Sequence, residues 1–290
     1  MSFKSLNPTE DTVTTLITVT NGFHDGGVGT LAGSNFTTAS LSAAQKSYYY
    51  NVQYNSKDHF SVSYGHIGGS GSAEQSTTQE GTTQAIYKQF YNYTEPTAAN
   101  LRDGAQFSIA STDTPDAYFI VAERLQMKDR LNPGTWTITL SGSNTAGVAT
   151  SLSLTDDSKT EDAITPGSPF GEVYSIVSGS AGTKVGSTTY GKFYPDAGLF
   201  VLSANQVSSS LPGSGSTAAY QMAGGAVNQF NGLAPDLRVN DAADNAWKIA
   251  RAMELGSVTM RSEEKQYIYD YFCRAKVNEF NLSNNITFWS

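Results

Sequence analysis

Residues 118–141 read YFIVAERLQMKDRLNPGTWTITLS and give the clearest indication of the fold. The run at 118–121 is apolar and rich in β-branched and aromatic residues, which predicts a buried strand. The Asn132-Pro133-Gly134 sequence predicts a turn, because proline fixes φ and glycine accepts a positive φ. Residues 135–141 then alternate apolar with hydroxyl side chains, as a half-buried strand does. Between the strands, residues 123–131 predict either a helical turn or an exposed extended segment. The stretch as a whole indicates scaffold.

The composition around this stretch is poor in charge and rich in turn-forming residues. Charged residues make up 15% of the 290, well below the usual quarter, and the chain holds 27 Gly and 16 Tyr. This composition suits β structure with many turns and surfaces that meet other proteins. The net charge of -8 disfavours nucleic-acid binding, since no cluster of Lys and Arg is present to contact phosphates.

The single cysteine and the hydropathy pattern limit the class of protein further. One cysteine, Cys273, cannot form an intramolecular disulfide framework. The N-terminal residues lack the apolar segment of a signal peptide, and no apolar run is long enough to span a membrane. We therefore expect a chain made in a cytoplasm, with no membrane span.

The fold class that we predict is α+β, mostly antiparallel β, with a sandwich-like core and about two helices. The helices are expected at 77–93 and 243–255, where apolar residues recur at helical spacing. Hairpins are expected over 52–64 and 189–203, because alternating strands flank turn sequences there. Tyrosines alternate with polar residues along 267–276, which predicts a long strand with its Tyr and Cys face buried.

The predicted organisation is an extended N-terminal arm at 1–40 and a single mainly-β domain at 41–290. A strand is expected at 13–19 within the arm. Gly- and Ser-rich loops are expected at 66–80, 141–169 and 205–226, with Leu152 and Leu154 as a possible minor strand inside the second. The acidic pairs Asp156-Asp157 and Glu161-Asp162 lie in the second of these loops and are interpreted as a solvated turn rather than a cation site.

The residues offer little for catalysis. His24, His59 and His66 are the only histidines, and a metal site or hydrolase centre would have to be assembled from them across separate loops. Cys273 has no histidine near it in sequence, so a core thiol is the preferred interpretation. Gly27–Ala32 fits a dinucleotide pattern only formally, because neither the helix nor the acidic residue follows. We predict no catalytic, cofactor-binding or metal-binding residues.

Several segments together resemble a family of virion structural proteins of large contractile-tailed phages, especially those that infect cyanobacteria. The resemblance spans roughly residues 85–285 and follows the same order. Its segments are the 118–141 stretch, GEVYSIVSGS at 171–180, YGKFYPDAGLFVLSANQ at 190–206 and YFCRAKVNEFNLSNN at 271–285. It implies a component of the tail or its baseplate, located in the virion, that contacts other tail proteins and copies of itself and needs no cofactor.

Two departures from the family concern the C-terminal end. Family members usually read Asn-Pro-Thr-Phe where this chain has Asn285-Ile286-Thr287-Phe288, and they usually continue into further strands. Phe288 and Trp289 therefore call for a partner surface to cover them. The other interface candidates are two tyrosines, Tyr48 and Tyr49, and three basic residues of the 118–141 stretch, Arg124, Lys128 and Arg130.

Three alternatives stay open from the sequence. The first is a neck or head-associated structural protein. The second is a receptor-binding or adhesin module that holds host glycans on an exposed cluster drawn from Tyr48, Tyr49, Tyr91 and Tyr93. The third is a hydrolase built on the histidines.

Overall fold

The computed structural model describes residues 12–22, 30–32, 36–38, 49–69, 81–95, 105–143, 148–164, 171–211, 233 and 242–271. Contacts divide the chain into a large unit, Thr20–Glu263, and a small unit that joins Met1–Val19 with Glu264–Ser290. The sequence did not anticipate this joining of the two ends. The arm boundary expected at residue 40 stays a prediction, because residues 39–48 lie outside the described part.

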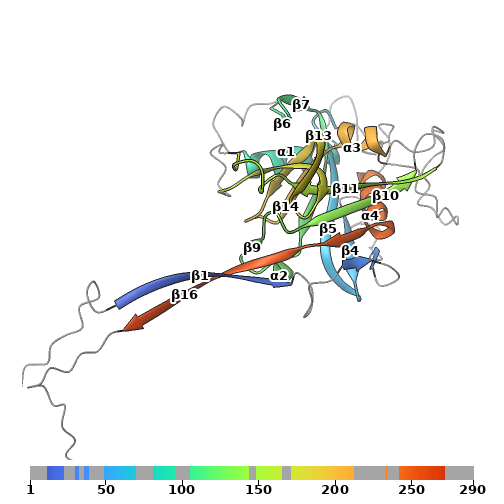
Figure 1. Cartoon of the computed structure of the whole chain (residues 1–290). Helices are drawn as coiled ribbons and strands as arrows, with labels where there is room; N and C mark the ends of the chain where they lie inside the picture. The colour runs from blue at the N-terminus through green and yellow to red at the C-terminus, as the bar shows by residue number, and fades with distance from the viewer. Residues whose placement is uncertain are drawn as a thin grey trace, which may run out of the picture. The chain divides into compact units, whose positions relative to one another are not determined.

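The large unit is built on one antiparallel sheet of eleven strands, drawn in Figure 1. The order along the sheet is β2 (Thr30–Ala32), β15 (Ser257–Thr259), β10 (Thr137–Ser143), β11 (Ala149–Asp156), β12 (Tyr174–Ser180), β13 (Thr183–Tyr194), β14 (Leu199–Ser203), β8 (Asp116–Ala122), β5 (Lys57–His66), β4 (Tyr50–Tyr54) and β3 (Phe36–Thr38). Neighbouring strands pair antiparallel throughout. The predicted α+β class with a mostly antiparallel core is confirmed.

Two smaller sheets complete the strand inventory of the described residues. One pairs β6 (Phe107–Ile109) with β7 (Thr112–Thr114). The other has the order β1 (Thr12–Gly22), β16 (Arg261–Tyr271) and β9 (Arg130–Leu131). The strand predicted at 13–19 is confirmed as part of β1.

Four helices are present in the described residues. The two predicted ones are confirmed as α1 (Thr82–Thr94) and α4 (Ala242–Leu255). A short helix, α2 (Arg124–Met127), confirms the helical-turn alternative for the opening stretch. Helix α3 (Ala204–Ser210) occupies the start of the loop predicted at 205–226, and the Ser203 hydroxyl caps it by accepting from the Gln206 amide. Serine is a preferred N-cap, so Ser203 marks the start of this helix.

The eleven-stranded sheet curls around a core that α4 closes. Helix α4 packs against β10 near one end of the strand order and against β4 and β5 near the other end. One helix can touch both only if the sheet curves back on itself, and Figure 1 shows α4 beside these strands. The enclosed side chains include Trp136, Phe193 and Phe200, whose rings pack edge-to-face and stacked with centroids 4.7–5.2 Å apart. The core is thus one curled sheet that faces itself.

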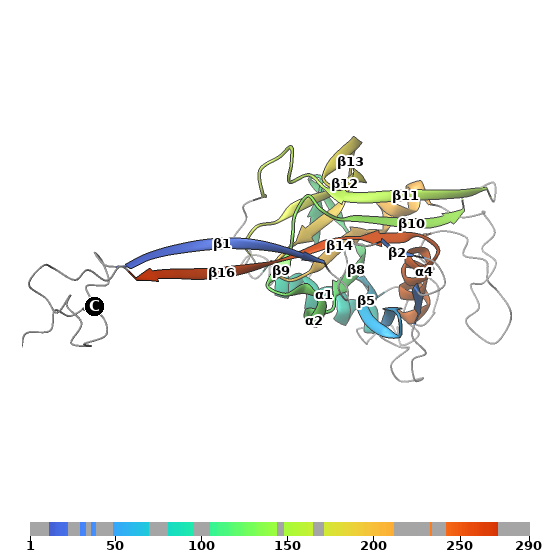
Figure 2. The same ribbon diagram turned by 60° about the horizontal axis from the view of Figure 1, so that its bottom comes forward.

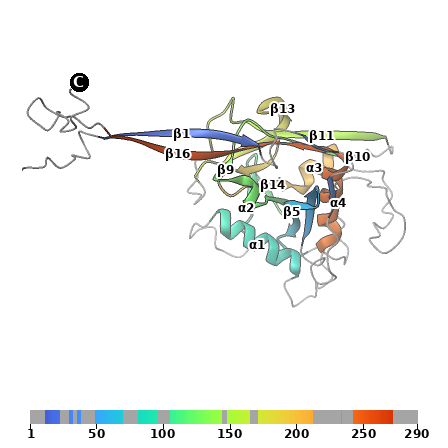
Figure 3. The ribbon, with the colours of Figure 1, turned by 90° about the horizontal axis from the view of Figure 1, so that it is seen from below.

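Helix α1 covers the opposite face of the same sheet. Phe90 of α1 stacks on Phe119 of β8, with ring centroids 4.3 Å apart and an interplanar angle of 11°. The helix approaches β5 so closely at Gly65 that a Cβ there would lie 2.8 Å from the backbone nitrogen of Tyr87. Figure 3 shows β5 between α1 and α4. Both faces of the central strands are therefore buried, which explains the apolar run at 118–121.

The predicted turn at Asn132-Pro133-Gly134 is confirmed and has a carboxylate beneath it. Gly134 has φ of +73°. Its amide donates to both carboxylate oxygens of Asp156 at 2.9 Å, and the Ser158 amide donates to the same carboxylate at 3.0 Å. Asp156 is fully buried and Asp157 is 6% exposed. The interpretation of this pair as a solvated turn is therefore wrong: the carboxylates satisfy buried backbone N–H groups that have no strand partner.

Burial has a further effect on Asp157. It raises the pKa of the carboxyl above its ordinary value, although hydrogen bonds from Ser175 partly oppose the rise. The Ser175 amide donates to Asp157 Oδ1 at 2.9 Å, so this side chain ties β12 to the end of β11. Both aspartates thus have structural roles at one end of the β10–β11 pair.

Replacing Asp156 with alanine is expected to lower the free energy of unfolding by about 2 kcal/mol, because the buried amides of Gly134 and Ser158 lose their acceptor. Chemical denaturation followed by circular dichroism measures the loss. Asp162→Ala is the matched control, since Asp162 is an exposed aspartate in the same acidic segment. Its effect should stay within about 0.5 kcal/mol of the unchanged chain. Equal effects of the two substitutions would contradict the role assigned to Asp156.

The possible minor strand around Leu152 and Leu154 is confirmed as β11, which pairs with both β10 and β12. The segment expected as a loop at 141–169 therefore holds a full strand over Ala149–Asp156. One serine of β11 bonds across the sheet to a threonine of β10. The hydroxyls of Thr139 and Ser153 are 3.0 Å apart on neighbouring strands. Hydroxyl pairs of this kind stabilise a sheet face, so a Ser- and Thr-rich segment can be a strand.

The buried tyrosine face predicted for the long C-terminal strand is also wrong. The strand is confirmed over residues 267–271, as the end of β16, and residues 272–276 lie outside the described part. Tyr267, Tyr269 and Tyr271 are 56–61% exposed, and Ile268, on the other face, is 41% exposed. Alternation predicted which side chains share a face. It could not show whether a second layer covers that face. Cys273 lies outside the described residues.

The two hairpins predicted from turn sequences are confirmed. In the first, β4 and β5 join through Asn55 and Ser56, whose φ values of 49° and 61° are those of the turns that suit hairpins. In the second, β13 and β14 join through residues 195–198. Of the loop predicted at 66–80, residues 70–80 lie outside the described part.

Candidate functional site

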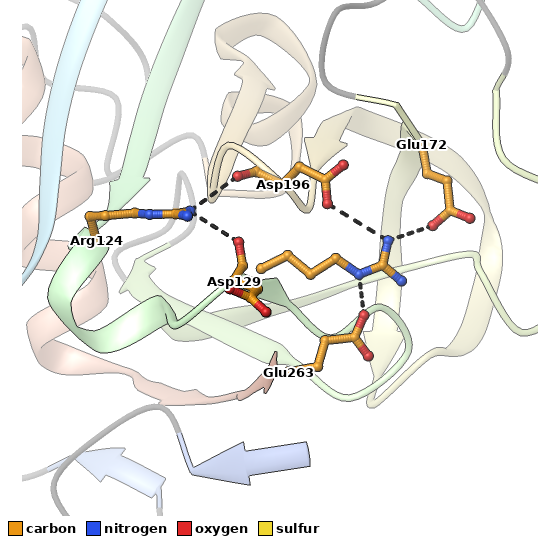
Figure 4. Close-up of polar contacts among 6 residues, drawn as sticks. Arg124, Asp129, Glu172, Asp196 and Glu263 are labelled. Carbon is orange, nitrogen blue, oxygen red and sulfur yellow. Dashed lines mark hydrogen bonds and ion pairs between the residues drawn. The ribbon is translucent and has the colours of Figure 1, made fainter. Parts of the chain in front are cut away.

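A cluster of charges surrounds Arg130 where β9 meets the start of β16. Arg130 and Glu263 are direct partners in the register of these two strands. The Arg130 Nε donates to Glu263 Oε1, and Arg130 Nη1 lies 2.9 Å from Glu172 Oε2 and 3.7 Å from Asp196 Oδ1. Figure 4 shows the three carboxylates converging on this guanidinium. Three acidic side chains from distant parts of the sequence therefore share one cation.

The burial of this cluster is uneven. The side chains of Arg130 and Glu263 are 20% and 8% exposed, whereas those of Glu172 and Asp196 are 48% and 42% exposed. Burial alone lowers the pKa of Arg130, but the hydrogen bonds that Arg130 donates to Glu263 and Glu172, together with their negative charges, outweigh it and leave the pKa raised. The guanidinium therefore stays charged. Because Arg130 and Glu263 are the most buried members of the cluster, breaking this ion pair is expected to cost more stability than breaking either of the other two.

Arg124 and Lys128, the other basic residues of the opening stretch, are exposed. Arg124 Nη1 donates to the backbone carbonyls of Asp129 at 3.0 Å and Asp196 at 3.5 Å, as Figure 4 shows. Lys128 follows α2 with a φ of 60°. The structure thus brings the three basic residues into one region. Arg130 is mostly buried there, and contact of any of the three with a partner stays a prediction.

A groove of about 450 Å³ lies on the α1 side of the sheet. Tyr49 and Phe90 line it together with the polar residues Asn51, Ser61, Gln89 and Glu123. Two of these are fixed by hydrogen bonds: the Ser61 hydroxyl donates to Asn51 Oδ1 at 2.8 Å, and Asn51 Nδ2 donates to Asp58 at 2.8 Å. Apolar lining with a few oriented polar groups is the usual make-up of a small-molecule site.

The tyrosines proposed for a glycan site do not form one exposed cluster. Tyr49 is half-buried in the groove, Tyr93 is 54% exposed, and Tyr91 is buried at 6%. Tyr48, Phe288 and Trp289 lie outside the described residues. Sequence reasoning missed Phe90 and Gln89 of the groove, and also the carboxylates around Arg130. No local pattern marks these carboxylates, which stand 42 to 133 residues from Arg130.

The two described histidines lie far apart. His59 and His66 are seven residues apart along β5, which corresponds to about 23 Å on an extended strand. His59 is buried, and its Nδ1 lies 2.9 Å from the Lys57 carbonyl. Burial lowers the pKa of His66, whose Nδ1 accepts from the Gly68 amide. The two imidazoles do not share a site. Among the residues that the structure describes, no group of three or more His, Cys, Asp or Glu side chains could hold a metal ion.

Comparisons with protein-family models, with curated proteins and with solved structures find no match to this chain. Within the described residues, no helix has the length and apolar character needed to cross a membrane.

Proposed function

We propose that this chain is a non-enzymatic structural subunit of a bacteriophage tail, placed at the baseplate, that joins its neighbours through exposed aromatic and aliphatic surfaces. The observation that carries the proposal is the crowding of large exposed apolar side chains on two paired strands. β1 contributes Val13, Leu16 and Ile17, and β16 contributes four more. Among the described residues, thirteen such side chains are exposed, and these two strands carry seven.

Such strands need a partner. β9 pairs with β16 only at Ser262 and Glu263, so beyond Glu263 the described strands β1 and β16 form a two-stranded ribbon. Such a ribbon is at best marginally stable in water, and exposed apolar groups on both faces add to the cost. Burial of these side chains against another subunit removes that cost and orders the strands at the same time. The low charge of the chain and its resemblance to tail proteins of contractile phages support a virion as the place where this burial occurs.

The test is the location of the chain in phage particles. Antibodies raised against the purified chain, followed by gold labelling and electron microscopy, should mark the baseplate end of the tail. Gold label at the neck or head would still support a structural role in the virion, but it would contradict the baseplate as the position of the chain. Recovery of the chain only in the soluble lysate, with none in purified particles by mass spectrometry, would contradict a structural role.

A second candidate function is favoured by the groove beside α1. Two aromatic residues, Tyr49 and Phe90, line the groove together with polar residues that include Gln89 and Glu123, which suits a sugar with one apolar face and several hydroxyls. A receptor-binding module would place host glycans here.

For that candidate, Tyr49→Ala is expected to weaken glycan binding about tenfold or more, since a stacked aromatic ring contributes roughly a tenfold factor. Binding is measured on a glycan array and then by calorimetry on any sugar that scores. Tyr93→Ala is the matched control, because Tyr93 is an exposed tyrosine of α1 that does not line the groove. An array without any bound glycan would rule this candidate out.

A further inference from the structure

Strand β1 has a free edge that carries no charge. In the described part of the chain its neighbour is β16, and β1 ends the strand order of its sheet. Figure 2 shows the two strands side by side and running in opposite directions. The sequence of β1 is TVTTLITVTNG, without any Lys, Arg, Asp, Glu or Pro. Proteins usually protect edge strands with such residues, so an unprotected edge of this length indicates that another strand pairs with it.

Both faces of β1 are also open. Residues 13–18 are exposed in succession, and Val19 is half-buried. Since successive side chains point to opposite faces, no layer covers either face of this segment within the described residues. A partner strand could therefore approach the edge without displacing packed side chains.

The order of residues in β1 identifies the partner. The segment is nearly palindromic about Leu16: Val13 and Val19 stand three residues either side of it, and Thr14 and Thr18 stand two either side. If two copies pair antiparallel about a two-fold axis at Leu16, Val13 faces Val19, Thr14 faces Thr18, and Leu16 faces its own counterpart. Matched apolar and matched threonine pairs are favourable across antiparallel strands.

We propose that two copies of this chain associate by antiparallel pairing of their β1 strands, centred on Leu16. The pairing joins the two three-stranded sheets into one with the order β9-β16-β1-β1-β16-β9. About six to eight ladder hydrogen bonds form over residues 13–19, because every second residue pair exchanges two. The contact is self-complementary and closes under two-fold symmetry. Since β1 is uncharged, two copies meet there without local repulsion, although the whole chain carries a net charge of -8.

This inference rests on the proposed assembly role and names the first contact in it. Leu16→Lys is expected to weaken self-association of the full chain about 100-fold, because two ammonium groups then face each other across the axis. Leu16→Glu should do the same. An equimolar mixture of the two variants should associate again, as lysine then faces glutamate. Sedimentation velocity over a concentration series measures all three.

The matched control is Leu125→Lys, which places the same charge on a leucine of α2 that is 85% exposed. It should leave self-association unchanged. A wild-type chain that stays monomeric, or a Leu16→Lys chain that associates normally, overturns pairing through β1. The same holds if the mixed variants fail to associate. These results leave the proposed function standing if gold label still marks the tail, so the two failures can be told apart.

Discussion

Replacing Trp136 with alanine is expected to lower the free energy of unfolding by about 4 kcal/mol. Trp136 is the largest fully buried side chain in the described residues. It packs edge-to-face on Phe193 and Phe200, with centroids 5.2 Å and 4.8 Å away. Those two rings come from β13 and β14, while Trp136 directly precedes β10. The indole therefore fills the space that the curl of the sheet encloses. Its removal leaves a cavity between β10 and the β13–β14 pair, neither of which is next to β10 in the sheet.

The matched control for Trp136 is phenylalanine at the same position. The indole nitrogen has no hydrogen-bond partner among the described residues, so phenylalanine keeps most of the packing and removes a buried unsatisfied donor. Trp136→Phe should cost about 1 kcal/mol. Both variants are compared by guanidinium denaturation. A loss below 1 kcal/mol for Trp136→Ala would contradict the enclosed position of the ring.

The local sequence pattern was sufficient to predict the strands at 118–121 and 137–141, but it did not predict which strands lie beside each of them in the sheet. Residues 118–121 and 137–141 are in strands, as the apolar run and the alternation indicated. In the sheet order, however, β11, β12, β13 and β14 stand between β10 and β8. Alternation fixes which side chains share a face. The choice of neighbouring strand depends on contacts between distant segments, and these leave no local period in the sequence.

In the candidate sites, too, the sequence shows which residue types are present but not which of them meet in space. Arg130 was selected from the sequence as a basic residue in a well-defined stretch, but Glu263 is 133 residues away and became its partner only through the pairing of β9 with β16. Tyr49 was selected as an aromatic residue near a strand, and α1 then brought Phe90 and Gln89 beside it. Residue type can be recognised in a sequence. The convergence of types from separate elements is a property of the fold.

Replacing Arg130 with leucine is expected to lower the free energy of unfolding by about 3 kcal/mol. The loss arises mainly at Glu263, whose side chain is 8% exposed and would keep a buried charge without a partner. Glu172 and Asp196 contribute little, because they are more than 40% exposed and water screens them. Since the strong pair is mostly buried, added salt should reduce the loss only slightly.

A double substitution separates the value of the ion pair from the cost of breaking it. In the Arg130→Leu/Glu263→Leu chain no buried charge remains, and two apolar side chains fill the same place between β9 and β16. This chain should regain most of the stability lost in Arg130→Leu, because a buried ion pair and a packed apolar pair are often close in free energy. Arg124→Leu is the matched control: it removes an exposed arginine from the same region, bonded only to backbone carbonyls, and should cost about 0.5 kcal/mol. Urea denaturation of the four chains gives the values. If Arg130→Leu loses no more than Arg124→Leu, or if the double variant is no more stable than Arg130→Leu, then Arg130 does not neutralise a buried carboxylate.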